Sequence, residues 1–285
     1  MSTRDKNIHV LILAACIALD VFLWSQVFLG GSRDRPELYF LDVGQGDSEL
    51  IVLPGNVKIL IDAGPDGKVL RSLERILGSA DRYIDVAVIT HPQLDHFNGF
   101  NTLLGRYRFG VFATNGRSVE QPEWFMLTEK LQAGRTPHVV LGAGDSLSYR
   151  DHSVSVLSPD GEWIGSGELN DTSLVMMVNS PRFRGLFTGD IGSNVEEYLA
   201  DRNNLQADIL KIPHHGSKYS SSDRFLKEVG PKITVIEVGQ NRYGHPTEEA
   251  RGRISAFTPH LFRTDRDGTV KLVRRGEKIQ VFTER

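Results

Sequence analysis

Residues 90–99 read Thr-His-Pro-Gln-Leu-Asp-His-Phe-Asn-Gly and follow a run rich in β-branched residues over 84–90. Such a run predicts a buried strand that leads the chain to His91. A loop after the strand has no fixed period, so it can direct His91, Asp95 and His96 into one pocket. Two imidazoles and a carboxylate suit Zn²⁺, Mn²⁺ or iron. The stretch therefore predicts a metal site at the end of a strand.

Three more groups of metal-ligand residues follow other predicted strands. They are Asp190, the adjacent His214 and His215, and His245. Sheets in α/β proteins gather their ligand groups beyond the carboxyl ends of the strands. Four such groups at four strand ends indicate one site assembled from distant parts of the chain, which chance does not readily produce.

The order of the predicted elements indicates the fold class. Short strands come first, over 38–42, 48–53 and 57–62, and a hairpin is predicted over 173–188. Strands and helices alternate after residue 194. Two sheets covered by helices, an αββα sandwich, fit this order. We predict a single domain of this kind over residues 38–285.

The motifs resemble those of the metallo-β-lactamase superfamily, and specifically the C-terminal hydrolase domain of ComEC-type competence proteins. The resemblance runs in the family's order from Leu38 to Val273, nearly the whole predicted domain. Besides residues 90–99, it is carried by LDVGQGD at 41–47, DAG at 62–64, NDTSLV at 170–175, LFTGD at 186–190, LKIPHHGS at 210–217, NRYGHP at 241–246 and RTD at 263–265.

The resemblance implies roles for these residues. His91 would hold a first metal, and Asp95 and His96 a second. Asp190 would bridge the two, and His214 or His245 would complete the set. Asp62 would orient a ligand from behind, as carboxylates commonly do for metal-bound histidines. Asp42 and Asp47 would brace the same loops. Lys218 or Arg242 is a candidate to face a substrate phosphate.

The sequence departs from the superfamily's pattern at the first metal. Gln93 stands where the full motif has a second histidine, and the segment at Asn170 lacks a histidine that many members use. These changes leave open whether one or two divalent ions, Zn²⁺ or Mn²⁺, are bound. His214 and His215 cannot point the same way along an extended chain, so one of them is expected to lie behind the metal or to face the substrate.

The N-terminal region predicts a membrane anchor. Residues 8–30 are almost wholly apolar, with Asp20 as the one ionised side chain, and are long enough to cross a bilayer. A tail over 1–7 precedes this span and a polar linker over 31–37 follows it. We expect a single-pass protein of the cell membrane with its domain outside the cytoplasm. Two alternatives are a lipoprotein anchored at Cys16 and an N-terminal helix buried on the domain.

Composition and charge restrict the classes of function that this chain can have. The 33 Lys and Arg residues against 36 Asp and Glu give a net charge of −3, which argues against a broad nucleic-acid surface. A single cysteine excludes an internal disulfide.

The resemblance predicts a metal-dependent hydrolase, with a phosphodiester of DNA as the leading substrate and a separate uptake channel as partner. Alternative substrates are a cell-wall phosphoester, a lactone and, least favoured, a β-lactam. The alternative to an enzyme is a metal-poor module that binds nucleic acid or an envelope partner.

Overall fold

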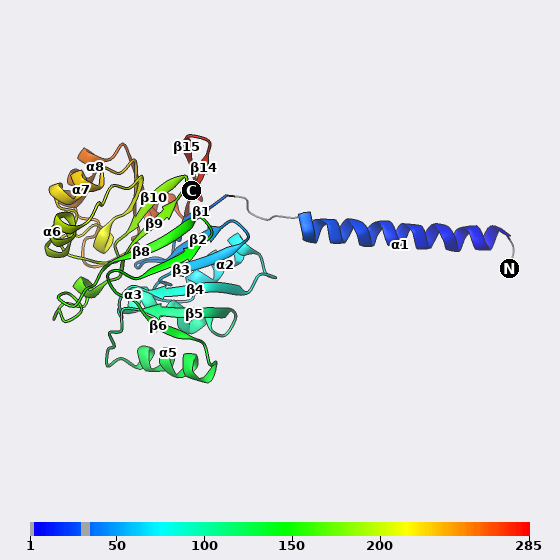
Figure 1. The fold of residues 1–285 in the computed structure, drawn as a ribbon, viewed down its shortest axis with the longest axis horizontal. Coiled ribbons are helices and arrows are strands. Elements are labelled where there is room, and N and C mark those ends of the chain that lie inside the picture. The colour runs from blue at the N-terminus through cyan, green and yellow to red at the C-terminus, as the bar shows by residue number, and fades with distance from the viewer. Residues whose placement is uncertain (1–2, 30–34) are drawn as a thin grey trace.

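The computed structural model describes residues 3–29 and 35–285. Two β-sheets lie face to face, and helices cover the outer face of each, as Figure 1 shows. The predicted αββα sandwich is therefore confirmed. The first sheet has the strand order β15-β14-β1-β2-β3-β4-β5-β6. Its strands are β1 (Glu37–Phe40), β2 (Glu49–Leu53), β3 (Val57–Ile61), β4 (Tyr83–Ile89), β5 (Arg108–Thr114), β6 (His138–Val140), β14 (Val270–Arg275) and β15 (Lys278–Thr283).

The second sheet has the order β13-β12-β11-β10-β9-β8-β7. Its strands are β7 (Ser146–Tyr149), β8 (His152–Ser158), β9 (Val175–Ser180), β10 (Phe183–Phe187), β11 (Ile209–Lys211), β12 (Ile233–Ile236) and β13 (His260–Arg263). In this sheet β10, β11, β12 and β13 run parallel, as do β3, β4, β5 and β6 in the first. The loops that follow β4, β10, β11 and β12 all open at one end of the sandwich.

Apart from the N-terminal helix described below, the helices are short and pack on the outer faces. They are α2 (Lys68–Leu77), α3 (Leu94–Phe97), α4 (Gly99–Leu103) and α5 (Pro122–Ala133) on the first sheet, α6 (Ser193–Arg202), α7 (Asp223–Val229) and α8 (Glu248–Phe257) on the second, and α9 (Thr264–Asp267) after β13. Two 3₁₀ turns, Asn170–Thr172 and Pro213–Gly216, lie in the loops. Strands over 108–114 and 138–140 were not predicted, since Gly110 interrupts the first run and the second has three residues.

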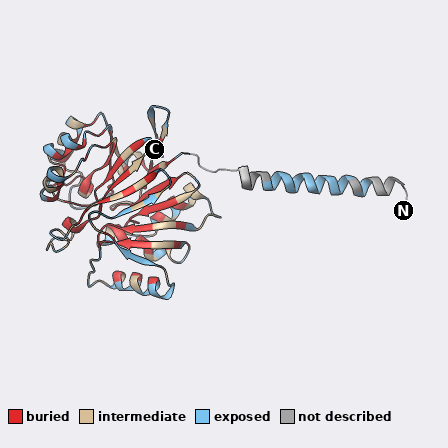
Figure 2. Cartoon of the chain, in the orientation of Figure 1, coloured by how far each residue is buried: buried red, intermediate tan, exposed pale blue. Residues whose placement is uncertain are grey.

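Three apolar cores hold these layers together. Between the sheets, Phe40 of β1 stacks on Phe187 of β10 with ring centroids 5.9 Å apart. Outside the first sheet, Phe97 packs edge-on against Trp124 of α5. Outside the second sheet, side chains of α6, α7 and α8, such as Phe225, are fully buried. Figure 2 shows buried residues concentrated along the strands and on the inner sides of the helices.

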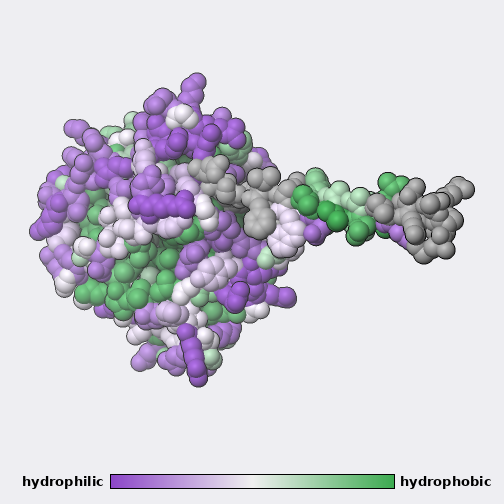
Figure 3. All heavy atoms as spheres, turned by 45° about the vertical axis from the view of Figure 1, so that its right-hand side comes forward, coloured by the Kyte–Doolittle hydropathy of each residue, from purple (hydrophilic) through white to green (hydrophobic). Residues whose placement is uncertain are grey.

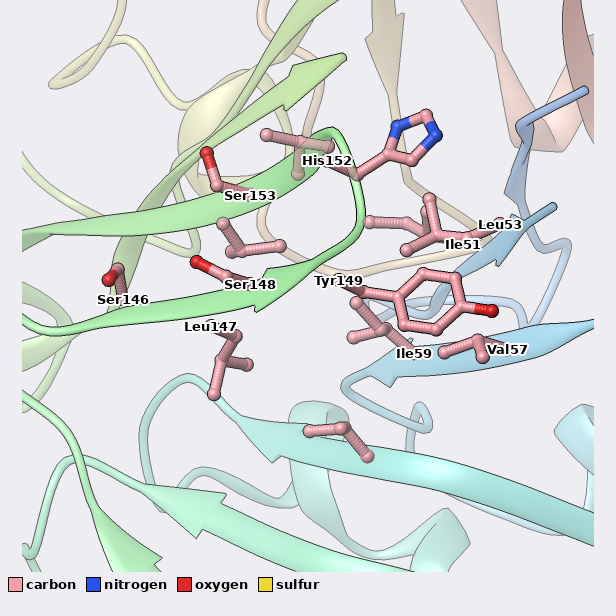
Figure 4. A pocket seen from close by; sticks show the side chains of 13 residues that line it. Ile51, Leu53, Val57, Ile59, Ser146, Leu147, Ser148, Tyr149, His152 and Ser153 are labelled. Carbon is pink, nitrogen blue, oxygen red and sulfur yellow. The ribbon is translucent and has the colours of Figure 1, made fainter. Parts of the chain in front are cut away.

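A cavity of about 330 Å³ lies between the sheets, at the end of the sandwich where β2 turns into β3. Figure 4 shows Leu147 and Tyr149 of β7 on one wall and Ile51, Val57 and Ile59 on the other. The pairing of Leu53 with Val57 marks this end, and the pairing of Glu49 with Ile61 marks the other. The predicted metal-ligand residues lie at that other end, so the cavity is not part of their site.

The N-terminal helix α1 (Thr3–Leu29) projects from the domain, as Figures 1 and 3 show. Within the described part of the chain, no helix is both long enough and apolar enough to span a bilayer. The membrane span predicted over 8–30 is therefore not supported. Cys16, the alternative lipid-attachment residue, is exposed on this helix. The described side chains of α1 are exposed, which does not fit the alternative of a helix buried on the domain. Part of the predicted linker, residues 30–34, falls outside the described residues.

Glu196 of α6 gives a first testable prediction. Its buried carboxylate accepts backbone hydrogen bonds from Ser221, at 2.5 Å, and from Ser222, at 2.8 Å, and burial raises its pKa to about 7. Between the unfolded-state pKa near 4.5 and 7, only the folded chain keeps this proton, so stability falls as the pH rises through this window. We expect Glu196→Gln to remove the contribution of this carboxyl to the pH dependence of the free energy of unfolding. Urea unfolding at about pH 5 and about pH 8 measures the change.

The neighbouring Glu197 is the matched control because its side chain is 41% exposed, whereas that of Glu196 is buried. Glu197→Gln should leave the pH dependence of the unfolding free energy close to that of the parent chain. Equal pH dependence in the parent and in Glu196→Gln would contradict the assignment of this component to Glu196.

Candidate metal centre

The segment that carries Asp95 and His96 is one helical turn, α3, placed directly after β4. Two glycines allow neighbouring loops to pack against it. A Cβ at Gly46 would lie 2.2 Å from the carbonyl oxygen of Asp95, and a Cβ at Gly99 would lie 1.9 Å from that of Ala63. The loops after β1 and β3 therefore approach α3 closely, and only glycine permits that approach at these two positions.

Five side chains converge at the loop end of the sandwich. Oδ2 of Asp190 lies 3.3 Å from Nε2 of His96 and 3.3 Å from Nε2 of His215. Asp95 lies on the other side, with Oδ2 3.3 Å from Nε2 of His215 and Oδ1 4.0 Å from Nε2 of His96. His91 lies beside His96, with ring centroids 4.1 Å apart. Ligand atoms of these residues form overlapping groups within the reach of one ion.

Several of these buried atoms have no hydrogen-bond partner in the described part of the chain. They are Nε2 of His91, His96 and His215 and Oδ1 of Asp190. Buried polar atoms are nearly always paired, so three unpaired imidazole nitrogens grouped around one carboxylate call for a ligand. Three imidazole nitrogens and a carboxylate oxygen are the donor set that Zn²⁺ and related divalent ions prefer. The residues present therefore fit a divalent metal ion.

The other ring nitrogens of the histidines are held from behind. Nδ1 of His96 lies 2.8 Å from Oδ2 of Asp62, and Nδ1 of His215 lies 2.8 Å from the backbone oxygen of Glu237. Asp62 in turn accepts hydrogen bonds from the backbone N–H (2.8 Å) and the hydroxyl (2.6 Å) of Thr90. Contacts of this kind fix the ring orientation and direct Nε2 toward the centre.

The contact between Asp62 and His96 gives a second prediction. We expect Asp62→Ala to weaken metal binding by about 10- to 100-fold, the usual cost of losing a carboxylate behind a ligand histidine. Titration of the metal-free chain with Zn²⁺ and with Mn²⁺, followed by calorimetry, measures this change. Asp66→Ala is the control, because Asp66 is half-exposed on the same loop. Equal affinities in the two variants would show that Asp62 does not orient a ligand.

Electrostatics favour a cation at this position. Burial and the charge of His96 lower the pKa of His91 to about 3, so this ring is neutral. Burial alone would lower the pKa of His96 and His215, but the charge of Asp190 and its neighbours outweighs it and raises both. Burial would raise the pKa of Asp190, yet the two imidazoles hold it well below its usual value. A divalent cation here would replace the two imidazolium protons.

A buried lysine lies behind the centre. Lys211, the last residue of β11, is fully buried, forms an ion pair with Asp47 and donates to the backbone oxygen of Gly189 at 2.8 Å. Its Nζ also lies 3.6 Å from Oδ1 of Asp190. Burial would lower the pKa of Lys211, but the charges of Asp47 and Asp190 raise it. The sequence analysis missed this residue, although a single lysine within the apolar run 209–212 is a recognisable signal.

Two buried acids adjoin Asp47 and were also missed. Burial and the charge of Asp47 raise the pKa of Glu237 to about 8, and burial and the charge of Glu237 raise that of Glu49. Oε1 of Glu237 accepts the backbone N–H of Ser48 at 3.1 Å. These contacts connect the start of β2 to the end of β12, so the two sheets are joined directly behind the centre.

Gln93, Asn170 and His214 form a hydrogen-bonded row where a first metal would lie. Nε2 of Gln93 donates to Oδ1 of Asn170 at 2.5 Å, and Nδ2 of Asn170 lies 3.3 Å from Nε2 of His214. These polar groups therefore satisfy one another. His214 and His215 both adopt left-handed backbone conformations, with φ of 51° and 52°. The chain is not extended there, and this turn directs His215 toward Asp95 and Asp190 and leaves His214 at the edge.

The remaining predicted residues surround the centre. His245 is partly buried, with its ring 5.6 Å from that of His214 and not in contact with Asp190. Lys218 and Arg242 lie further out, each over the ring of the tyrosine that follows it. Asp42, predicted to brace the loops, pairs with Arg285 at the periphery. The structure thus brings His91, Asp95, His96, Asp190 and His215 together, while His214 and His245 stand beside them.

Comparison with known proteins supports this architecture. "ComE operon protein 3" of Bacillus subtilis is 28% identical over 260 residues, which are 82% of this chain and 32% of that protein. "Competence protein ComA" of Neisseria gonorrhoeae is 30% identical over 299 residues, covering 95% of this chain and 40% of that protein. The chain therefore spans about a third to two fifths of the length of these relatives.

The fold and the family are matched independently. The metallo-beta-lactamase fold protein YhfI from Bacillus subtilis superimposes with a TM-score of 0.56 at 12% identity, over 83% of this chain and 99% of that one. At that identity the match concerns the fold alone. The sequence model of the metallo-beta-lactamase superfamily matches residues 41–239. That segment holds His91, Asp95, His96, Asp190 and His215. By sequence and by fold, this chain belongs to the metallo-beta-lactamase superfamily.

Proposed function

We propose that this chain is a metal-dependent phosphodiesterase that cleaves DNA. The observation that carries the proposal is the group of buried, unpaired ligand atoms around Asp190. The superfamily membership supports hydrolysis as the reaction class, and the name of the Neisseria gonorrhoeae relative, a competence protein, supports DNA as the substrate.

One divalent ion, Zn²⁺ or Mn²⁺, is the proposed cofactor. His91, Asp95, His96, Asp190 and His215, whose ligand atoms form overlapping groups, would hold it. A second ion is less well provided for, because Gln93 and Asn170 already satisfy each other's polar groups. The bound ion would lower the pKa of a water molecule and stabilise charge that develops on a phosphoryl oxygen.

The chain's own residues would position the substrate. Asp95 is the most exposed member of the cluster, with 30% of its side chain accessible. Its pKa is lowered, since the charges and hydrogen bonds of His215 and His96 outweigh burial. The carboxylate therefore stays ionised at the mouth of the site, where it can orient a water molecule. Lys218 and Arg242 at the rim would attract the phosphates on either side of the scissile bond.

A role in DNA uptake would involve a path for the DNA as well as a hydrolase. This chain matches 32% and 40% of the length of the two relatives named above. We propose that a separate channel protein conducts the DNA and that this domain acts on one strand next to it.

The proposal is tested by metal content and cleavage in the full chain. Bound metal is counted by mass spectrometry, and cleavage of single-stranded DNA and of bis-(p-nitrophenyl) phosphate is followed with Mn²⁺, Zn²⁺ or Mg²⁺. We expect about one ion per chain and cleavage that chelator and His96→Ala both abolish. Metal binding without cleavage of either phosphodiester would point to another ester, such as a lactone. A folded chain with neither metal nor cleavage would be a binding module.

A further inference from the structure

Two tyrosines on the rim of the metal centre are strongly exposed. Tyr219 is 69% exposed and Tyr243 is 63% exposed, the highest values among the large apolar and aromatic side chains described in the domain. Tyr219 follows the turn that carries His214 and His215, and Tyr243 lies two residues before His245. Burying an aromatic ring is favourable, so two exposed rings beside one site suggest a ligand surface.

The backbone holds both rings in place. The N–H of Tyr219 donates to the hydroxyl of Ser217 at 3.3 Å, and its backbone oxygen accepts the N–H of Ser193 at 3.0 Å. Oδ1 of Asn241 accepts the backbone N–H groups of both Tyr243 and His245, each at 3.0 Å. The two tyrosines are therefore presented from ordered loops rather than from free chain ends.

The two loops also pack against each other. The N–H of Thr247 donates to the backbone oxygen of Gly216 at 3.0 Å, and a Cβ at Gly216 would lie 2.6 Å from Cβ of Pro246. The loop that carries His214, His215 and Tyr219 and the loop that carries Tyr243 and His245 form one side of the site. A ligand that reaches the metal centre from this side meets both.

A cation accompanies each ring. Nζ of Lys218 lies 4.9 Å from the ring centroid of Tyr219, and Cζ of Arg242 lies 5.6 Å from that of Tyr243. Neither cation forms an ion pair with a carboxylate among the described residues, so both charges are free to meet an anion. An aromatic face with an adjacent cation is the combination that binds a base and its phosphate in single-stranded nucleic acids.

A row of rings connects the buried centre to the surface. Centroid distances are 6.2 Å from His215 to His214, 5.6 Å from His214 to His245, and 5.9 Å from His245 to Tyr243. The rings of His245 and Tyr243 are stacked, with an interplanar angle of 24°. A base lying on Tyr243 would thus stand at the outer end of this row, whose inner end is His215, 3.3 Å from Asp190.

We propose that Tyr219 and Tyr243 are stacking platforms for the bases of a single-stranded nucleic acid, with Lys218 and Arg242 holding its phosphates. The inference rests on the proposed function, because it assigns the substrate's contacts at the same site. Single strands are favoured over duplexes because paired bases are already stacked on one another and do not offer a free face. The small number of contacts fits a chain whose net charge is −3.

Binding by the full chain to a labelled oligonucleotide tests the platforms. Fluorescence anisotropy is recorded in chelator, so that no strand is cleaved, for a single-stranded oligonucleotide and for an abasic strand of equal length. We expect Tyr219→Leu and Tyr243→Leu each to weaken binding of the normal strand about tenfold and to change binding of the abasic strand little. Tyr83→Leu is the matched control, since Tyr83 is exposed at the opposite end of β4. Normal binding by both rim variants would overturn the proposal.

Salt dependence separates the cations from the rings. Lys218→Gln and Arg242→Gln should each reduce the slope of log K against log salt by about 0.7, the value for one phosphate contact on a single strand. The tyrosine variants should lower affinity at every salt concentration without changing this slope. A tyrosine variant whose affinity falls equally for the normal strand and the abasic strand would show that the rings do not contact bases.

Cleavage assays distinguish this proposal from the proposed function. With metal present, the tyrosine variants should raise KM for single-stranded DNA more than they lower kcat. A parent chain that binds the strand through its tyrosines but cleaves no phosphodiester would refute the nuclease and keep the platforms. A parent chain that cleaves DNA, with unchanged KM in both variants, would refute the platforms alone.

Discussion

Replacement of Asp190 by alanine is expected to remove bound metal and to lower the rate of phosphodiester cleavage by at least about a hundredfold. Asp190 lies 3.3 Å from both His96 and His215, so its loss removes the group that connects them. It also removes the negative charge that contributes most to raising the pKa of both imidazoles. Metal content and the rate of cleavage, measured on the same preparation, check this result.

His260→Ala is the control for Asp190→Ala. His260 is exposed at the start of β13 and belongs to none of the groups around the centre. Neither metal content nor cleavage should change. An Asp190→Ala chain that kept full metal and full activity would show that the metal lies elsewhere, and the assignment of the whole cluster would be wrong.

Lys211→Met is expected to lower the free energy of unfolding of the metal-free chain by about 3–5 kcal/mol. The side chain is fully buried, and its removal takes from the buried Asp47 carboxylate its nearest cation, leaving the more distant His215 at 3.2 Å. Desolvation of an unpaired charge is costly in the low-dielectric interior, which is why breaking one half of a buried pair is so destabilising. Urea unfolding followed by circular dichroism, in chelator, measures the change.

The double variant Asp47→Asn, Lys211→Met separates the lost ion pair from lost packing. With no charge left unpaired, it should recover roughly half or more of the stability that Lys211→Met loses. A double variant as unstable as the single one would show that Lys211 acts through packing and through its hydrogen bond to Gly189. A single variant with nearly normal stability would mean that water or another cation replaces the lysine.

Much of the fold was predictable from local patterns. The apolar run 84–90 predicted β4, and the turn at Ser180 and Pro181 predicted the hairpin of β9 and β10. Strand β5, which lies between β4 and β6, was missed because Gly110 and the charged residue Arg108 interrupt its apolar pattern. Its stability comes from pairing with β4 and from the aromatic contacts of Phe109 and Phe112 with Phe100 of α4, which are tertiary interactions.

The ligand residues were predicted less completely than the fold. His91, Asp95, His96 and Asp190 were named from motifs at strand ends, and the structure brings them together. His214 or His245 was expected to complete the set, yet His215 faces Asp95 and Asp190. That expectation came from the resemblance, whereas the expectation that His214 and His215 point different ways assumed an extended chain, in which neighbouring side chains alternate. The left-handed turn at 214–215 follows other rules, and no residue pattern announced it.

The sequence by itself determined most of the candidate ligand residues and the αββα arrangement of sheets and helices, because strand periodicity and strand-end motifs are local properties. Only the tertiary structure decided which histidine meets Asp190, and that Lys211 and Asp47 form a buried pair behind the centre. Those outcomes depend on distances between residues far apart in the chain. The cost of leaving a buried charge or ring nitrogen unpaired is set by that surrounding packing, so it cannot be read from one segment.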